Sequence, residues 1–303
     1  MNQLKISYLK HEDIDANKWD QCMEAAPNSL VYSQSWYLDK ICDCWDALVI
    51  GNYQYVMPLT HRKKMGINYL YQPLFSQQLG IFPTPTKEIS QLFLAEINMR
   101  FPFVEINLNA MQLPVEGFGL HEERQTFLLS LNDSYEQIAG KYSSHTKRKL
   151  KKAKKKNLSL VSSISAEEYL DFKIKNLRIK LSSKEINKLR NILTFALTNS
   201  LGQIYGVYSI ENKLCTAAFF IRHKQRITFL NASNSPEGKE HQAMYFLIDH
   251  FIQNNAGKDF LLDFEGSMIL GVARLYEGFG AVPEKYHHYK WNNLPWWLKW
   301  FKK

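Results

Sequence analysis

The chain has 303 residues, of which 45% are hydrophobic and 14% aromatic, and its formal net charge is +9. This composition supports a sizeable buried core, so it excludes a disordered chain and predicts two domains or one large one. No window approaches the roughly 18 uncharged apolar residues of a membrane span, and the first residues lack the apolar stretch of a signal peptide. We therefore expect a cytoplasmic protein.

The first half predicts strands at Ala47–Ile50, Tyr53–His61 and Ile67–Tyr71, separated by short sequences that are typical of hairpin turns. A loop with two prolines follows. Apolar residues then recur at helical spacing over 89–97, and the apolar run Phe103–Leu108 predicts a fourth strand. The predicted order is three antiparallel strands, a helix and a strand, and a further strand is expected at 127–131.

Eight of the ten residues from Lys147 to Lys156 are basic, and without this segment the net charge would be +1. If Ser143 caps a helix, Tyr142, Thr146, Leu150 and Ala153 form one apolar stripe and the basic side chains cover the rest of the surface. Clustered cations bind polyanions by releasing counterions, so the helix is predicted to bind nucleic acid, anionic lipid or another phosphate-rich partner. The alternative is a solvated helix face.

The second half repeats the order of the first. Two helices are expected at Glu167–Lys180 and Lys184–Leu201, before the sheet. The further elements are strands at 204–210, 214–222 and 226–231, a helix over 244–252 that ends near Gly257, a strand at 260–264, a helix at 269–277 and a strand at 286–291. Two copies of one order predict an α/β fold (α+β, with mixed sheets) made of two tandem domains. We place these at residues 1–132 and 133–303, so that the second domain begins with the basic helix.

Four segments carry a family resemblance: 144–161 (SHTKRKLKKAKKKNLSLV), 262–267 (LDFEGS), 276–280 (YEGFG) and 29–36 (SLVYSQSW). Together with the element order, they resemble the FemAB group of aminoacyl transferases, which consist of tandem GNAT-like domains and add amino acids to peptidoglycan precursors. The resemblance implies an acyl or aminoacyl transferase that acts on an amine. It also implies an acceptor cleft and a substrate-binding strand end, with the following residues: Trp36, Tyr71, Gln72, Gly266 and Ser267.

Acyl transfer to an amine requires a group that removes a proton from the attacking nitrogen. Asp263 and Glu265 flank the end of an apolar strand, where ligand crevices of open α/β sheets form. Strand alternation would turn both carboxylates to one face, and Glu265 is the better candidate base. Asp263 could instead cap the helix that begins near Ile269. Tyr276 stands where the family has a lysine, and it could orient a substrate carbonyl or phosphate, or simply pack in the core.

Other polar residues are weaker substrate-binding candidates. Asn231 and Ser233 end a strand and could bind substrate or form a turn, and Arg274 could pair with Glu277 or with an anionic substrate. The donor could be acyl-CoA or an aminoacyl-tRNA. The approach to the helix at 244 carries one glycine and two carboxylates, which suit a pyrophosphate poorly, so we rank the charged tRNA higher. Its phosphates would meet four residues of the basic helix: Lys147, Arg148, Lys151 and Lys152.

The segment Leu294–Lys303 combines three tryptophans and a phenylalanine with lysines, as peripheral membrane anchors do. The alternative is that its tryptophans pack on the body of the protein. The runner-up function is accordingly a non-catalytic protein that docks on anionic membrane or RNA.

The cysteines Cys22, Cys42, Cys44 and Cys215 form no C-x-x-C pair, and no histidine lies at metal-ligand spacing. We expect reduced thiols and neither a disulfide framework nor a metal site. Hydrolase, nucleotide-triphosphatase and dehydrogenase fingerprints are absent from the sequence.

Overall fold

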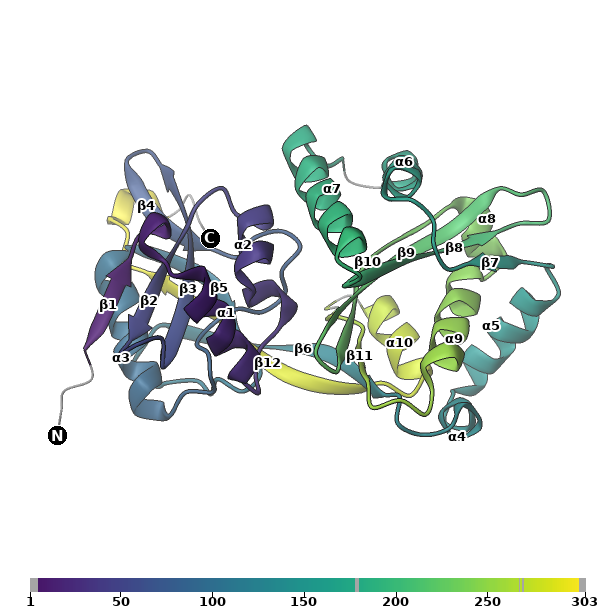
Figure 1. Cartoon of the computed structure of the whole chain (residues 1–303), viewed down its shortest axis with the longest axis horizontal. Coiled ribbons are helices and arrows are strands. Elements are labelled where there is room, and N and C mark those ends of the chain that lie inside the picture. The colour runs from purple at the N-terminus through teal and green to yellow at the C-terminus, as the bar shows by residue number, and fades with distance from the viewer. Residues whose placement is uncertain (1–4, 178–179, 267, 269, 300–303) are drawn as a thin grey trace. The chain divides into compact units, whose positions relative to one another are not determined.

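The computed structural model describes residues 5–177, 180–266, 268 and 270–299. Its contacts divide the chain into two compact units (Figure 1). Unit 1 comprises Met1–Arg124 and Lys285–Lys303, and unit 2 comprises Gln125–Glu284. The last residues of the chain thus belong with the first unit, whereas the sequence placed a single boundary at 132/133. The physical reason is that residues 287–292 pair with a strand of the first unit along their whole length.

Unit 1 is built on a mixed sheet in the order β1-β2-β3-β4-β5-β12. The strands are β1 (Ile6–Leu9), β2 (Trp45–Ile50), β3 (Tyr55–Lys64), β4 (Ile67–Tyr71), β5 (Phe103–Leu108) and β12 (Val282–Asn292). Only β4 and β5 are parallel neighbours, because the helix α3 (Lys87–Arg100) crosses between them. The buried face of α3, with Ile89, Phe93 and Ile97, packs on this sheet and forms the core of the unit.

Two further helices belong to unit 1, α1 (Ala16–Ala25) and α2 (Ser35–Ile41). Short 3-10 turns precede each of them, η1 (His11–Asp13) and η2 (Val31–Ser33). A last short helix, α11 (Trp296–Lys299), follows β12. Helix α1 is capped by Asp15, whose side chain accepts from the N–H of Lys18.

Unit 2 has the strand order β6-β11-β10-β9-β8-β7. The strands are β6 (Leu120–Ser130), β7 (Ser159–Val161), β8 (Gly202–Tyr208), β9 (Leu214–His223), β10 (Arg226–Asn234) and β11 (Leu261–Asp263). The helices are α4 (Tyr135–Gly140), α5 (Ser144–Lys154), α6 (Ala166–Asn176), α7 (Ser183–Thr198), α8 (Pro236–Glu240), α9 (Ala243–Asn255) and α10 (Leu270–Gly278).

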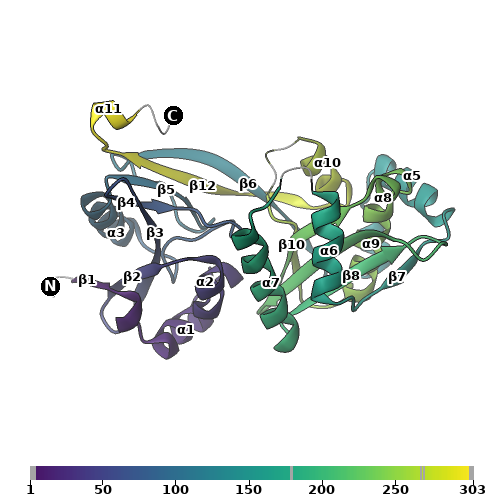
Figure 2. The ribbon, with the colours of Figure 1, turned by 90° about the horizontal axis from the view of Figure 1, so that it is seen from above.

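Helices cover both faces of the unit 2 sheet. Figures 1 and 2 show α6 and α7 over one face of strands β8–β10, while α5, α9 and α10 lie on the other face. Helix α9 is held by aromatic packing, because Phe251 stacks on Phe220 of β9 with ring centroids 3.7 Å apart. The mixed α/β fold is therefore as predicted, and the order of three antiparallel strands, helix and parallel strand occurs in each unit. That the two halves are tandem copies of one module stays a prediction.

The structure corrects several predicted boundaries. Strands β4 and β5 have the predicted bounds, but β6 begins at Leu120 instead of Phe127 and β12 at Val282 instead of Tyr286. The added residues are largely polar and half-exposed, so their sequence carries no apolar alternation that would reveal a strand.

Candidate active site

Two neighbouring strands of unit 2 separate at their carboxyl ends. The parallel pairing of β10 with β11 ends at Thr228 and Asp263, while β10 continues to Asn234 against β9 alone. The register with β9 shifts between Phe229 and Asn231, which marks a bulge. The backbone of β10 beyond Thr228 thus has an edge that β11 does not cover, and such an edge can bind an extended, amide-bearing chain.

Helix α6 places two buried polar side chains on this part of β10. The Tyr169 hydroxyl donates to Oδ1 of Asn231, and Nζ of Lys173 lies 3.4 Å from the carbonyl oxygen of Ala232. Lys173 is only 8% exposed, and burial lowers its pKa to about 8. A lysine with this pKa exchanges a proton near neutral pH, as a general base must.

Asp263 is held by three donors, and it is 1% exposed. Its Oδ1 accepts from the Thr126 hydroxyl at 2.7 Å and from the N–H of Glu265 at 2.9 Å, and its Oδ2 accepts from Nε of Arg226 at 2.9 Å. Arg226 also reaches Glu284 at 3.2 Å. The hydrogen bond from the Glu265 N–H makes an Asx turn at the end of the strand. The sequence had offered a different local role for Asp263, as the cap of the following helix. A carboxylate in this position orders the strand end.

Glu265 does not continue strand β11. Its φ is +56°, in the left-handed region, so the alternation that would have turned it to the face of Asp263 ends before it. The sequence-based reason for pairing these two carboxylates on one strand face is therefore wrong. Asp263 nevertheless adjoins Glu265, since its Oδ1 accepts from the Glu265 N–H. Burial, followed by the charges of Glu265 and Asp263, raises the pKa of the Tyr276 hydroxyl.

Tyr276 lies in the core of unit 2. Its ring stacks on Phe264 with centroids 4.6 Å apart, contacts Phe229 edge to face and lies tilted against Phe127. The charges of Glu265 and Asp263 act on its hydroxyl group. This position is compatible with both predicted roles, packing and substrate orientation.

The remaining predicted residues of unit 2 are distributed more widely. Asn231 contacts Tyr169 as described, and the carbonyl oxygen of Ser233 accepts from the Thr216 hydroxyl at 2.9 Å. Arg274 lines a separate groove of about 500 Å³ between α10 and the start of α5, together with Glu277 and His145. Gly266 is half-buried directly after Glu265, and Ser267 lies outside the described residues.

In unit 1, the three predicted acceptor-site residues have structural contacts. Gln72 accepts from the backbone N–H of Asn107 at 2.8 Å and donates to Ser76, so its amide fixes a loop. Tyr71 lies under the guanidinium of Arg62, 4.2 Å from the ring centroid, and Trp36 contacts Tyr37 edge to face. No contact that joins all three is found among the residues that the structure describes.

Among the residues that the structure describes, two groups of side chains could hold a metal ion. Cys44, Asp46 and His61 form one of them, with His61 Nε2 at 3.1 Å from Asp46 Oδ2 and 3.5 Å from Cys44 Sγ. The sequence indicated no histidine near Cys44. This prediction is wrong, because the pairing of β2 with β3 brings His61 beside Cys44. Tyr8 and Lys10 already donate to the same Asp46 oxygen, so the carboxylate is satisfied without an ion. The second group is Cys215, Glu237 and His241.

The basic helix forms as predicted. The Ser143 side chain accepts from the N–H of Thr146 at the start of α5, and Thr146, Leu150 and Ala153 are buried. Lys147 and Lys151 line a groove, whereas Arg148 and Lys152 are exposed elsewhere on the helix.

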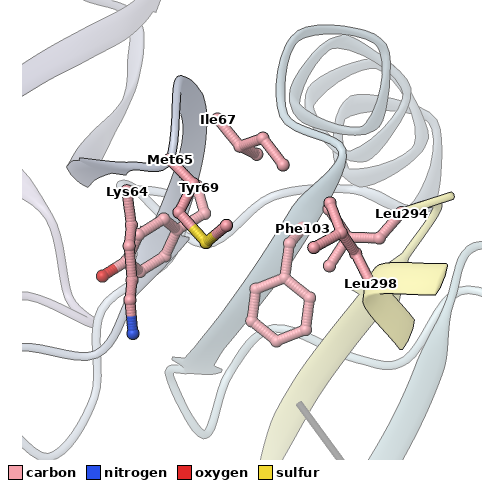
Figure 3. Close-up of a pocket in the computed structure, with 7 residues that line it drawn as sticks. All are labelled: Lys64, Met65, Ile67, Tyr69, Phe103, Leu294 and Leu298. Carbon is pink, nitrogen blue, oxygen red and sulfur yellow. The ribbon is translucent and has the colours of Figure 1, made fainter. Parts of the chain in front are cut away.

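The C-terminal segment contacts unit 1 through its leucines. Leu294 and Leu298 pack on Phe103 and, with Ile67 and Tyr69, enclose a small apolar pocket (Figure 3). Trp296 and Trp297 point away from this contact, since they are 84% and 53% exposed. Neither tryptophan is packed in the core, and the other aromatic residues of the segment lie outside the described residues. Among the helices described, none is both long and apolar enough to cross a bilayer.

No protein-family model matches the chain, and no curated protein matches its sequence. Solved structures do match. FemX aligns with a TM-score of 0.62 at 11% identity, and the alignment covers 93% of this chain and 97% of FemX. A conserved protein of unknown function from Bacteroides thetaiotaomicron aligns with 0.59 at 11% identity, over 95% of this chain and 99% of that one.

L-PGS from Bacillus licheniformis aligns with a TM-score of 0.55 at 10% identity, over 93% of each chain. At such low identity the similarity concerns the fold. The chain therefore has the fold of FemX and L-PGS, the FemAB-like, GNAT-type fold that its sequence predicts.

Proposed function

We propose that this protein transfers an acyl or aminoacyl group to an amine. The main support is the uncovered edge of β10 beyond Thr228, with the buried amine of Lys173 beside it. A substrate that contains amide groups, such as an amine acceptor on a short peptide, can hydrogen-bond along this edge, as an added strand does. Its attacking amine would then lie near a group that can take up a proton.

The proposed reaction forms a C–N bond and breaks the ester C–O bond of the donor. The amine attacks the acyl carbonyl and loses a proton to the neutral amine of Lys173, and the departing alkoxide then receives a proton from the ammonium so formed. Because the pKa of Lys173 is about 8, both protonation states are accessible near neutral pH. The sequence suggested Glu265 as the base; here we propose it as a second proton acceptor, and we propose Tyr276 as the substrate-orienting hydroxyl that the sequence suggested.

We favour an aminoacyl ester over acyl-CoA as the donor. Gly238 is the single glycine before α9, and it faces inward, since a Cβ on it would lie 2.2 Å from the carbonyl oxygen of Cys215. Its N–H donates to the Ser235 side chain at 3.0 Å. This backbone therefore does not form an open phosphate cradle before α9, in contrast to the glycine-rich loops that bind pyrophosphate.

The test is transfer of labelled acyl groups from aminoacyl-tRNA and from acyl-CoA to a panel of amines, including amino-acid side chains of cell-wall precursors. Lys173→Met should abolish transfer, while Lys175→Met, on the exposed side of the same helix, should retain it. If both variants transfer as well as the natural chain, Lys173 is not the proton acceptor. If no donor is used, the proposed function fails.

A second proposal is that the C-terminal segment docks the protein on anionic membranes, as the exposed Trp296 and Trp297 favour. Sedimentation with phosphatidylglycerol vesicles should carry the natural chain down and leave the Trp296→Ala, Trp297→Ala double variant in solution. Leu113→Ala removes another exposed apolar side chain of unit 1 and serves as the control. Equal sedimentation of all three proteins would contradict membrane docking by these tryptophans.

A further inference from the structure

A second groove in unit 2 lies between α4, α5 and α9. Its volume is about 510 Å³, within the range of about 300–1,000 Å³ that small-molecule sites have. The walls are partly apolar, with Ala139, Leu150 and the ring of Tyr142. Its size and mixed lining suit a compact ligand.

The groove contains a buried carboxylate and a hydroxyl without a partner. Asp249 and Tyr142 are each only 4% exposed. Asp249 Oδ1 accepts from the Tyr135 hydroxyl at 3.0 Å. The Tyr142 hydroxyl lies beside Asp249, and burial, followed by the charge of Asp249, raises its pKa. Its geometry nevertheless forms no well-aligned hydrogen bond to a described residue. A buried hydroxyl without a partner is costly unless something that binds there satisfies it.

Four lysines line the same groove. Lys147, Lys151 and Lys154 follow one another on α5 at spacings of four and three residues, and Lys155 adjoins them. Lys147 donates to the carbonyl oxygen of Gly140 at the end of α4. Lys151, Lys154 and Lys155 form no ion pair with the residues that the structure describes. These cations are therefore available to bind an anion.

From this combination we infer that the groove binds a small phosphorylated polyol, with its phosphate on the lysines of α5 and a sugar hydroxyl between Asp249 and Tyr142. Ammonium groups bind phosphate as point charges. A sugar hydroxyl can donate a hydrogen bond to the carboxylate of Asp249 and accept one from Tyr142. An ionised phosphate oxygen has no hydrogen to donate to Asp249, so a bare phosphate fits this position less well. Nucleotides and sugar phosphates share this chemistry.

The inference is independent of acyl transfer, because its readout is binding. Titration calorimetry of the full chain at low salt should detect ADP or glucose 6-phosphate, and inorganic pyrophosphate should bind about tenfold more weakly because it has no hydroxyl for Asp249. The relative affinities of ADP and glucose 6-phosphate show whether the groove prefers a nucleotide or a sugar phosphate.

Three variants locate the site. Lys151→Ala should weaken binding of the sugar phosphate about tenfold, whereas Lys149→Ala, on the same helix but outside the groove, should leave it unchanged. Tyr142→Phe should weaken the sugar phosphate without weakening pyrophosphate, and because it removes a hydroxyl that has no partner, the melting temperature should not fall.

Several results would overturn the inference. They are absence of binding of all three ligands at millimolar concentration, equal binding of pyrophosphate and the sugar phosphates, and equal losses in Lys149→Ala and Lys151→Ala. Binding of an RNA oligonucleotide without any of the small ligands would likewise overturn it, and would favour an extended polyanion on the basic helix.

Discussion

The buried amine of Lys173 should make the stability of the protein depend on pH in a defined way. Its pKa falls from 10.5 to about 8 on folding because the side chain is buried on β10. Between these values the unfolded chain still binds a proton that the folded chain has released. Stability therefore rises with pH through this window. Below about pH 8 both states are protonated, and the cost of burying the charge is fully present.

The difference between the two pKa values sets the size of the effect. A change of one pKa unit corresponds to about 1.4 kcal/mol, so the buried charge destabilises the folded state by about 3 kcal/mol at neutral pH. Lys173→Met keeps the length of the side chain and removes the charge. We expect this variant to be more stable than the natural chain at pH 7 by about 2–3 kcal/mol, after the loss of the long hydrogen bond to Ala232.

The assay is urea unfolding of the natural chain and of Lys173→Met between pH 7 and 9.5. The advantage of the variant should shrink steadily above pH 8, while Lys175→Met, which is exposed, should show no such trend. A difference that stays constant over this range would refute the lowered pKa, and with it the proton-accepting role. A Lys173→Met protein that is less stable at pH 7 would show that the amine stabilises the fold instead.

Three further changes test the packing of both units by urea unfolding. Asp263→Asn removes the buried one of the two carboxylates that Arg226 pairs with, and we expect a loss of about 3 kcal/mol, as for other broken buried pairs; a loss below about 1 kcal/mol would mean that the pairing with Glu284 is enough for Arg226. Gly238→Ala would place a methyl group 2.2 Å from the carbonyl oxygen of Cys215, so we expect a loss of about 2 kcal/mol or more; an unchanged midpoint would contradict the close approach. Leu298→Ala should cost about 2 kcal/mol and increase proteolysis after β12, whereas resistance equal to that of the natural chain would show that other contacts hold α11.

Periodicity and turn residues predicted most elements of the fold. The strands Ile67–Tyr71 and Phe103–Leu108 have the predicted bounds, and the buried stripe of the basic helix is the predicted one. These features follow from local patterns of apolar residues, which a sequence displays directly. Polar residues at the beginnings of β6 and β12 carry no such pattern, because those strands are half-exposed.

The candidate site was less predictable. Lys173 was not recognised, since a lysine on a helix normally indicates a solvated position, although its spacing of four from Tyr169 on a buried face was visible. The left-handed backbone of Glu265 and the separation of β10 from β11 depend on tertiary packing. Cys44 and His61 meet only through strand register.

The pairing of β5 with β12 has a consequence for the order in which the protein matures during synthesis. Leu108 pairs with His287, so the sheet of unit 1 cannot be completed until β12 has left the ribosome. Unit 2 lies entirely within the intervening sequence and can reach its folded state first. A stalled or nicked chain that ends before residue 285 should therefore leave an unfinished first unit with an open β5 edge, a site where nascent chains could associate wrongly.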